Sequence, residues 1–236
     1  MHEHRFPNES PAYREARDQL LEAEIDLRRN IERVAALRRR LPPGGEIAED
    51  YVFEEGRIDG EETRRTRLSE LFEPSGDTLV LYSFMYGPEM ERPCPSCTSI
   101  LDGLDGTAPH VRQRVGLAAV AKSPIDRIRA FARERGWRNH RLLSSAGNTY
   151  NRDYYGEDEN GDQWPSLNVF VRRDGRIHHS WHSELIFMPG EAGQDPRHVD
   201  MIWPLWSLLD LTPEGRGTDW NPRLEYEPAP AAAAEP

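Results

Sequence analysis

The two cysteines of this 236-residue chain lie close together, in the stretch Cys94-Pro95-Ser96-Cys97. They follow a mostly apolar run from Leu79 to Tyr86. Two thiols with this spacing can cycle between a dithiol and a disulfide, supply two ligands to a metal ion, or sit inert in a core. Because strand and helix patterns alternate around the pair, the sequence favours redox chemistry.

The predicted position of Cys94 favours its reactive thiolate form. An ordinary cysteine has a pKa of about 8.5, and the N–H groups and dipole at the start of a helix stabilise an anion. The pattern places Cys94 at such a start, with Pro95 in the first helical position, where a missing N–H costs little. Arg92 adds positive charge nearby, although two neighbouring glutamates oppose it. We therefore predict a modestly lowered pKa for Cys94 as the attacking thiol, and a shielded Cys97 that resolves the mixed disulfide.

The elements that must position this pair begin at Thr78. Hydrophobic patterning predicts strand, helix, strand, helix and a short strand, at residues 78–86, 98–114, 115–121, 123–135 and 141–145. Pro165 then leads into a hairpin of two strands, at residues 167–171 and about 176–185. A helix from Met201 to Leu211 carries two tryptophans at a spacing typical of a core. This order predicts an α/β fold, with a mixed sheet flanked by helices.

A long amphipathic helix precedes that domain. Residues 11 to about 40 contain no internal proline or glycine, and Leu20, Leu27 and Val34 recur every seven residues. Ser10 suits the N-cap, with a proline next to it. The apolar stripe predicts either packing on the helix's own domain or a homodimer seam, since a sevenfold repeat also suits a coiled coil.

We predict four parts of the chain. Residues 1–10 form a flexible arm, residues 11–75 the helix and a charged connector, residues 76–226 the α/β domain, and residues 227–236 a disordered tail. Within the connector, a short strand is expected at residues 51–53 and a short helix at residues 66–72.

Composition excludes several classes of protein. The net charge is −11, so the surface repels nucleic acid and anionic membranes, and neither is an expected partner. The first residues lack the apolar core of a signal peptide, and no apolar stretch approaches the roughly 20 residues that span a bilayer. We expect a cytoplasmic protein that needs no cofactor and acts on a thiol or disulfide substrate, either a protein or a small molecule.

Several of these features resemble the thioredoxin fold. The strand before Cys94-Pro95-Ser96-Cys97, the two strand–helix units and the later hairpin occur in the same order there. In that fold a cis-proline precedes the third core strand and lies against the active-site cysteines, and Pro165 matches it. The resemblance implies that Pro165 aligns a substrate. From their positions in the sequence, we add Trp164, next to Pro165, and the positively charged Arg92 as candidate substrate contacts. The isomer of Pro165 stays open at this point, because cis is the minority form of such bonds.

The chain from Pro11 to about Tyr226 more closely resembles the bacterial family DUF899, whose members are described as thioredoxin-like, predicted dithiol-disulfide oxidoreductases. The matching stretches are Glu22-Ala23-Glu24-Ile25-Asp26-Leu27-Arg28-Arg29, Leu41-Pro42-Pro43-Gly44-Gly45, Glu49-Asp50-Tyr51-Val52-Phe53, Cys94-Pro95-Ser96-Cys97, Gly136-Trp137 and Leu209-Asp210-Leu211-Thr212-Pro213-Glu214-Gly215-Arg216. The resemblance implies a redox-active CxxC disulfide in a bacterial protein.

One stretch departs from the family pattern, namely His178-His179-Ser180-Trp181-His182-Ser183-Glu184. Strict alternation on a strand would place His178, Ser180, His182 and Glu184 on one face and His179, Trp181 and Ser183 on the other. A histidine from this strand could join the two cysteines in a copper or zinc site. The alternative metal site therefore comprises Cys94, Cys97, His179 and His182; the simpler interpretation is the polar outer face of an edge strand.

The sequence thus predicts a dithiol-disulfide oxidoreductase in which Cys94 attacks and Cys97 resolves. Two alternatives remain open. One is a copper- or zinc-binding protein that uses the four residues above, and the other is a thioredoxin-like scaffold without catalysis.

Overall fold

The computed structural model describes residues 5–74, 76–190, 201–217 and 219–226. The predicted tail at residues 227–236, and residues 1–4 of the predicted arm, lie outside the described residues. The chain divides into two compact units, residues 1–42 and residues 43–236. The two are treated separately below.

The first unit is built on α1 (Pro11–Arg39), the long helix that the heptad pattern predicts. The Ser10 hydroxyl accepts a hydrogen bond from the backbone N–H of Tyr13 at 3.1 Å, so it caps the helix as its residue type suggests. Pro11 occupies the first turn, where no backbone donor is needed. The bounds and the N-cap of this helix are therefore confirmed.

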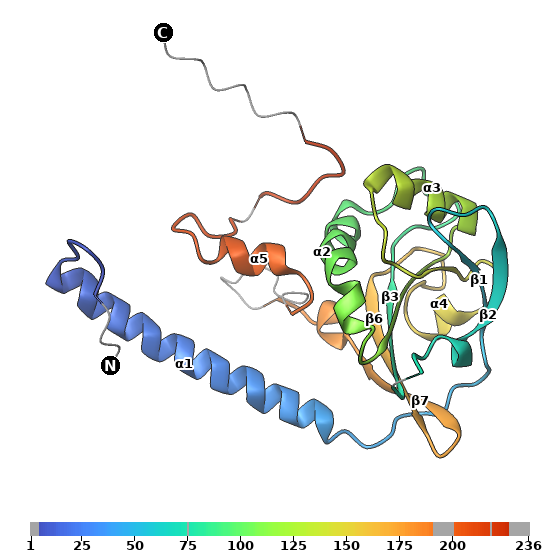
Figure 1. Cartoon of the computed structure of the whole chain (residues 1–236), viewed down its shortest axis with the longest axis horizontal. Helices are drawn as coiled ribbons and strands as arrows, with labels where there is room; N and C mark the ends of the chain where they lie inside the picture. The colour runs from blue at the N-terminus through green and yellow to red at the C-terminus, as the bar shows by residue number, and fades with distance from the viewer. Residues whose placement is uncertain (1–4, 75, 191–200, 218, 227–236) are drawn as a thin grey trace, which may run out of the picture. The chain divides into compact units, whose positions relative to one another are not determined.

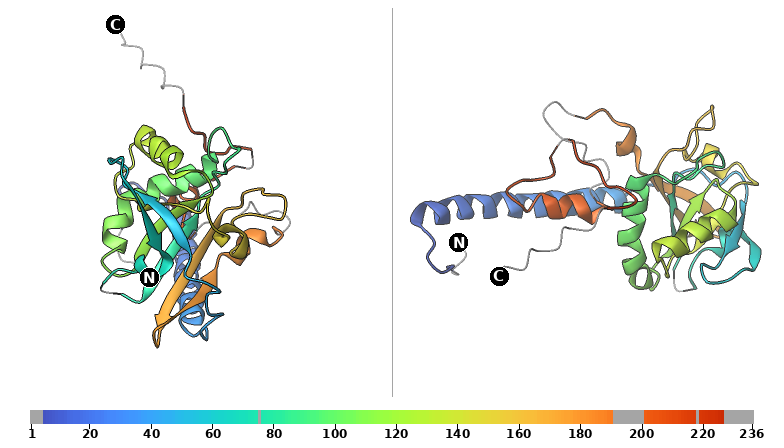
Figure 2. Two further views of the ribbon diagram at one scale, coloured as in Figure 1. Left: turned by 90° about the vertical axis from the view of Figure 1, so that its right-hand side faces the viewer. Right: turned by 90° about the horizontal axis from the view of Figure 1, so that it is seen from above.

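The second unit contains a seven-stranded sheet with the order β2-β1-β5-β4-β3-β6-β7. Its strands are β1 (Val52–Gly56), β2 (Thr63–Arg67), β3 (Thr78–Ser83), β4 (Gly116–Ala121), β5 (Leu142–Ser144), β6 (Ser166–Arg173) and β7 (Arg176–His182). β3, β4 and β5 run parallel, whereas β6 is antiparallel to β3. The β6–β7 hairpin, orange in Figure 2, forms one edge of the sheet. This arrangement confirms the thioredoxin-like mixed sheet.

The second unit also contains helices. They are α2 (Pro95–Val111), α3 (Ile125–Arg135), α4 (Tyr150–Asp153) and α5 (Pro204–Leu209), with single 3-10 turns at Leu68–Glu70 and Glu184–Phe187. Gly136 ends α3 with a φ of 80°, in the left-handed region that a glycine adopts without strain. Within the described part of the chain, every helix is too short or too polar to cross a membrane.

The sheet separates two hydrophobic clusters. On one face, Tyr82 of β3 packs with Cys97 and Leu101 of α2 and with Ile128 of α3. We call this side the thiol face. It also buries Trp203, and Trp206 of α5 joins the same cluster, which confirms these tryptophans as core residues.

The opposite side, which we call the histidine face, holds the second cluster. There, Leu81 of β3 and Phe170 of β6 pack with Tyr150 of α4. The His179 ring lies against Phe170, with 5.3 Å between the ring centroids. Figure 1 shows α2 and α4 on either side of β3 and β6. The two faces therefore carry different chemistry.

Three features differ from the sequence pattern. The stretch predicted as a connector supplies β1 and β2, and β1 pairs with β5, so the sheet extends beyond the predicted domain boundary at residue 76. The helix predicted at residues 66–72 is only a single 3-10 turn. The polar stretch after β5, which shows no helical periodicity, contains the one-turn helix α4. The division of the chain into four parts remains a prediction.

A β-bulge changes the orientation of side chains on β7. Opposite Val169 and Phe170 of β6, the register shifts, so that Trp181 pairs with Val169 and His179 with Phe170. The extra residue places His179 and His182 on one face, with 6.3 Å between their ring centroids. The strict alternation predicted for this strand is therefore wrong, because a bulge shifts the side chains beyond it to the other face.

Candidate active site at the cysteine pair

The cysteine pair lies at the start of α2, after the loop that follows the central strand β3. Cys94 is the N-cap residue of this helix and Pro95 its first helical residue, as the sequence predicts. The Cys94 backbone N–H donates to the Met85 carbonyl at 3.0 Å, and the Cys94 carbonyl accepts from the N–H of Thr98 at 3.0 Å. These bonds fix the Cys94 backbone, so its side chain is held at the positive end of the helix.

The pKa of Cys94 is lowered to about 6. Its largest cause is a hydrogen bond from the Cys97 thiol; partial burial opposes the shift, and the backbone N–H groups of Cys97 and Ser96 reinforce it. An acceptor that receives several N–H and thiol bonds is stabilised in its charged form. A large fraction of Cys94 is therefore thiolate at neutral pH. The pKa of Cys94 is lowered by more than the modest amount predicted from the sequence.

Cys97 has the opposite character. Its side chain is 1% exposed, and burial, followed by the hydrogen bond with Cys94 and by the negative charge of Cys94, raises its pKa well above the ordinary value. Both cysteines are free thiols. The environment thus favours negative charge on Cys94 and disfavours it on Cys97.

Tyr82 is a third member of this site that the sequence analysis missed. Its side chain is 1% exposed, and its buried hydroxyl lies beside the Cys97 thiol. Burial raises the pKa of Tyr82, and charge on Cys97 raises it further, so the hydroxyl faces the buried thiol. The signal was present in the sequence, because Tyr82 alternates with Val80 and Phe84 on the face of β3 that leads to the cysteines.

A cavity of about 620 Å³ lies beside the loop that precedes Cys94. We call it the Trp164 cavity. It is lined by Met85, Gly87, Pro88, Glu89, Met90, Lys122, Glu157, Asn160, Gly161, Asp162, Gln163 and Trp164. Trp164 is 43% exposed, and Met85 is the residue whose carbonyl holds the Cys94 N–H. The cavity therefore brings one predicted substrate contact to the loop that leads to Cys94.

The two other predicted substrate contacts lie differently. Pro165 directly precedes β6, whose first residue Ser166 pairs with Ser83 at the end of β3 where the chain leaves for the cysteines. Among the described residues no peptide bond is cis, so Pro165 is trans and differs from the cis-proline of the thioredoxin fold. The Arg92 guanidinium donates to Glu134 of α3 at 2.7 Å. Arg92 is thus tied to α3 and is absent from the lining of the Trp164 cavity.

Comparison with known proteins assigns the chain to a family. The model of DUF899, described as a bacterial protein of unknown function, matches residues 1–228. The chain belongs to this family. The search among curated proteins found no match.

Solved structures also resemble this DUF899 protein. Enterococcus faecalis AhpC is 12% identical, with 70% of this chain and 91% of that chain covered and a TM-score of 0.46. Peroxiredoxin Q of Xanthomonas campestris is 15% identical, with 59% and 84% covered and a TM-score of 0.42. The thioredoxin lipoprotein Etrx1 of Streptococcus pneumoniae is 14% identical, with 65% and 98% covered and a TM-score of 0.40. Because these scores are low, the fold assignment rests on the strand order described above.

The alternative metal site is not assembled in this DUF899 protein. Cys97 packs on the thiol face, whereas His179 contacts Phe170 on the histidine face, so the sheet separates the two sets of ligands. Among the described residues, no three His, Cys, Asp or Glu side chains are placed to hold one metal ion. The predicted combination of Cys94 and Cys97 with His179 and His182 is therefore wrong.

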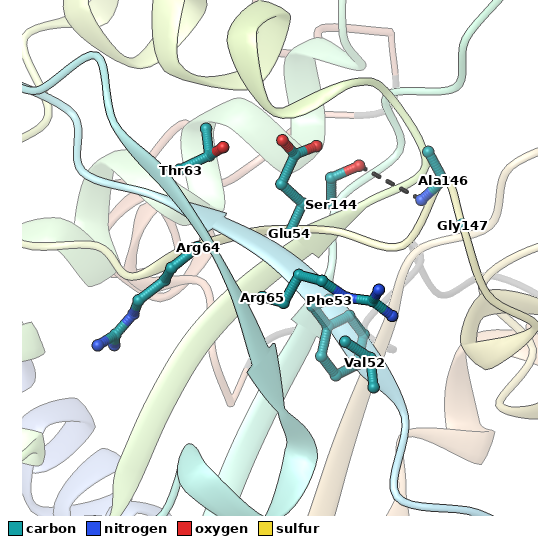
Figure 3. Close-up of a pocket in the computed structure, with 9 residues that line it drawn as sticks. All are labelled: Val52, Phe53, Glu54, Thr63, Arg64, Arg65, Ser144, Ala146 and Gly147. Carbon is teal, nitrogen blue, oxygen red and sulfur yellow. Dashed lines mark hydrogen bonds between the residues drawn. The ribbon is translucent and has the colours of Figure 1, made fainter.

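A further hollow, of about 370 Å³, lies at the β1–β2 hairpin (Figure 3). It is lined by Val52, Phe53, Glu54, Thr63, Arg64, Arg65, Ser144, Ala146 and Gly147. The Ser144 hydroxyl accepts from the Ala146 N–H at its rim. None of the predicted site residues lines this hollow, so it takes no part in the site at the cysteines.

Proposed function

We propose that this protein is a dithiol-disulfide oxidoreductase. The observation that carries the proposal is the pairing of a Cys94 whose pKa is about 6 with a buried, protonated Cys97 at the start of α2. A thiolate at neutral pH is the species that attacks disulfides. A second thiol one helical turn away can then release the bound substrate.

Both half-reactions balance in electrons and protons. The Cys94 thiolate attacks one sulfur of a substrate disulfide, so that a Cys94–substrate disulfide forms and the other substrate sulfur leaves as a thiolate. Cys97 then loses its proton and attacks the Cys94 sulfur. The Cys94–Cys97 disulfide forms, and the second substrate sulfur leaves and takes up a proton. Two electrons pass from the protein dithiol to the substrate, and an external dithiol must restore the protein.

The substrate is best accommodated at the Trp164 cavity. Met85 and Trp164 offer apolar surface beside the nucleophile's loop, and the Lys122 and Glu157 side chains, 3.1 Å apart, supply a polar wall. We propose that Trp164 and Pro165 contact the chain of a thiol or disulfide substrate, either a protein or a small molecule. Arg92 acts less directly, because Glu134 holds its guanidinium.

Substitution of the two cysteines, one at a time, tests the function. Cys94→Ser should abolish reduction of insulin or a small aromatic disulfide by chemically reduced protein. Cys97→Ser should retain the first attack and accumulate a mixed disulfide through Cys94, visible by mass spectrometry. A Cys94→Ser protein as active as the natural one would overturn the proposal. An inactive natural protein with an ordinary Cys94 pKa would instead indicate a non-catalytic scaffold.

We further propose that the protein works in the bacterial cytoplasm and that α1 mediates a homodimer. The paucity of cysteines supports a reducing compartment. The leucine and valine repeat along α1 supports pairing of two copies.

A further inference from the structure

A second cavity, of about 660 Å³, lies on the histidine face. We call it the His182 cavity. It is formed by the end of α4, the end of β7 and the 3-10 turn that follows β7, and it is lined by Asp153, Tyr154, Tyr155, His179, His182, Glu184, Phe187 and Met188. Its volume is in the range of small-molecule sites, roughly 300–1,000 Å³. Neither cysteine lines it.

One side chain in this cavity, that of His182, has a ring nitrogen that makes no hydrogen bond within the described residues. It is only 8% exposed, and its Nε2 is a buried polar atom without a hydrogen-bond partner among the described residues. A buried polar atom left unpaired costs about 1–3 kcal/mol, so native proteins satisfy most of them with protein, water or a ligand. Its neighbour His179 is already satisfied, because its Nε2 lies 2.9 Å from the Asn168 side-chain oxygen.

Aromatic rings surround this orphan nitrogen. The His182 ring stacks on Phe187, with centroids 5.7 Å apart and an interplanar angle of 12°. Tyr155 meets His182 edge-on at 5.9 Å, and Tyr154 lies 5.1 Å from His179. The β7 bulge is what brings both histidines to this group of rings. The faces of such rings carry negative partial charge and attract cations.

The charges that line the cavity are negative. Asp153 and Glu184 are its carboxylates, and neither lysine nor arginine occurs among its lining residues in the described part of the chain. Burial lowers the pKa of His179 and of His182, so both rings are neutral at pH 7. The carboxylate of Asp153 already accepts from the hydroxyls of Tyr51 and Thr149, which leaves Glu184 as the freer anion.

We propose that the His182 cavity binds an organic ammonium ion. The ammonium group would donate to His182 Nε2 and pair with the Glu184 carboxylate, while its carbon chain or ring packs on Tyr155 and Phe187. An ammonium group has three donors and no acceptor, which suits a cavity that offers acceptors and aromatic faces but no cationic side chain. Two sources share this chemistry, a free amine and the lysine side chain of a peptide.

This binding activity is independent of the proposed redox function. The cysteines belong to the thiol face and the cavity to the histidine face, so the sheet lies between them. The Cys94→Ser protein should therefore bind an amine as tightly as the natural protein does. Loss of reductase activity and loss of amine binding are in this way separate outcomes.

Calorimetric titration of the full-length protein with three probes tests the proposal. Phenethylammonium represents a free amine, N-acetyl-lysine methylamide represents a peptide side chain, and 2-phenylethanol is the neutral analogue with the same ring and chain length. We expect saturable binding to one site, with 2-phenylethanol at least fivefold weaker than the better of the two cations. Equal binding of the neutral analogue, or no binding of either cation, would overturn the proposal.

Three variants locate the site. His182→Phe keeps the ring stack on Phe187 but removes the orphan acceptor, and should weaken binding by about fivefold or more. Glu184→Gln, at an exposed position that folding tolerates, should weaken it by about threefold, as for one partly exposed ion pair. His110→Phe, on the exposed end of α2, is the control and should leave the affinity unchanged. Unaltered affinity in both His182→Phe and Glu184→Gln would show that the amine binds elsewhere.

Discussion

At the scale of single residues, Cys94 and Cys97 differ chiefly in their access to water and to N–H donors. Cys94 accepts hydrogen bonds from the thiol of Cys97 and from the first turn of α2. Cys97 lies in the core beside Tyr82. One negative charge is therefore favoured on the outer sulfur and disfavoured on the inner one, so the pair titrates in two separated steps.

The first prediction concerns the titration of Cys94. Ultraviolet absorbance of the thiolate should give an apparent pKa of about 6 in metal-free reduced protein. The rate of attack on a disulfide should rise as pH increases through this value, because only the thiolate reacts. In Cys97→Ala the pKa of Cys94 should be higher, since the strongest of its hydrogen bonds is lost. A pKa of Cys94 near that of a free thiol would contradict the argument that hydrogen bonds at the start of α2 stabilise its thiolate.

The second prediction concerns Tyr82, the buried hydroxyl beside Cys97. Tyr82→Phe should raise the pKa of Cys97, because the hydroxyl stabilises its thiolate. Release of a substrate from the mixed disulfide should therefore become slower at pH 7, while the first attack by Cys94 keeps its rate. Stopped-flow measurement of the two steps between pH 6 and 10 checks this.

A matched control for Tyr82 exists on the opposite face. Tyr150 is also fully buried, but it lies on the histidine face. Tyr150→Phe should leave both redox steps unchanged. Equal slowing in both variants would indicate a general effect on packing instead of a role at the thiol.

At the scale of elements, an ion pair joins β1 to the residue that precedes β5. The Glu55 carboxylate accepts from the Arg141 guanidinium at 2.9 Å, and both side chains are largely buried. Burial alone would raise the pKa of Glu55, but the bonds from Arg141 outweigh it and lower the pKa to about 2. The folded state therefore holds this carboxylate charged down to acidic pH.

The third prediction is that Glu55→Gln destabilises the protein by about 3 kcal/mol at pH 7, because it leaves Arg141 buried without its charge partner. The pKa of Glu55 is depressed on folding, so its stabilising effect is fully present above pH 4.5 and is lost as pH falls towards 2. Urea unfolding at pH 7 and pH 3 should show a smaller deficit at the lower pH. Glu54→Gln, on the exposed side of the same strand, should change stability little; an equal loss there would contradict the argument.

At the scale of the whole molecule, the long helix α1 carries an apolar residue at every seventh position. A coiled-coil seam explains this period, and the fourth prediction is that the protein is a dimer in sedimentation at micromolar concentration. Leu27→Asp should convert it to monomers without unfolding the α/β unit, and Arg29→Gln, on the opposite side of the same helix, should not. A monomeric natural protein would instead favour packing of α1 on its own domain.

The sequence by itself determined the main course of the chain and the position of the candidate nucleophile at a helix start. Local signals were sufficient for these features: the apolar runs of β3 and β4, the serine cap of α1 and the glycine stop of α3. The pair Cys94-Pro95-Ser96-Cys97 at a predicted helix start already indicated a lowered pKa, since a cap and a dipole depend on neighbours along the chain.

Only the tertiary structure decided what lies beside the cysteines and what lies across the sheet from them. The bulge opposite Val169 and Phe170 carries no signal of residue type, yet it places His179 and His182 together and away from the thiol face. Similarly, β1 pairs with β5 through residues that are about 90 positions apart. The local hydrophobic pattern does not predict a pairing over that distance. Helix capping and hydrophobic periodicity depend on near neighbours along the chain, so they can be predicted from the sequence. Side-chain burial and strand register depend on contacts that form only when distant segments pack.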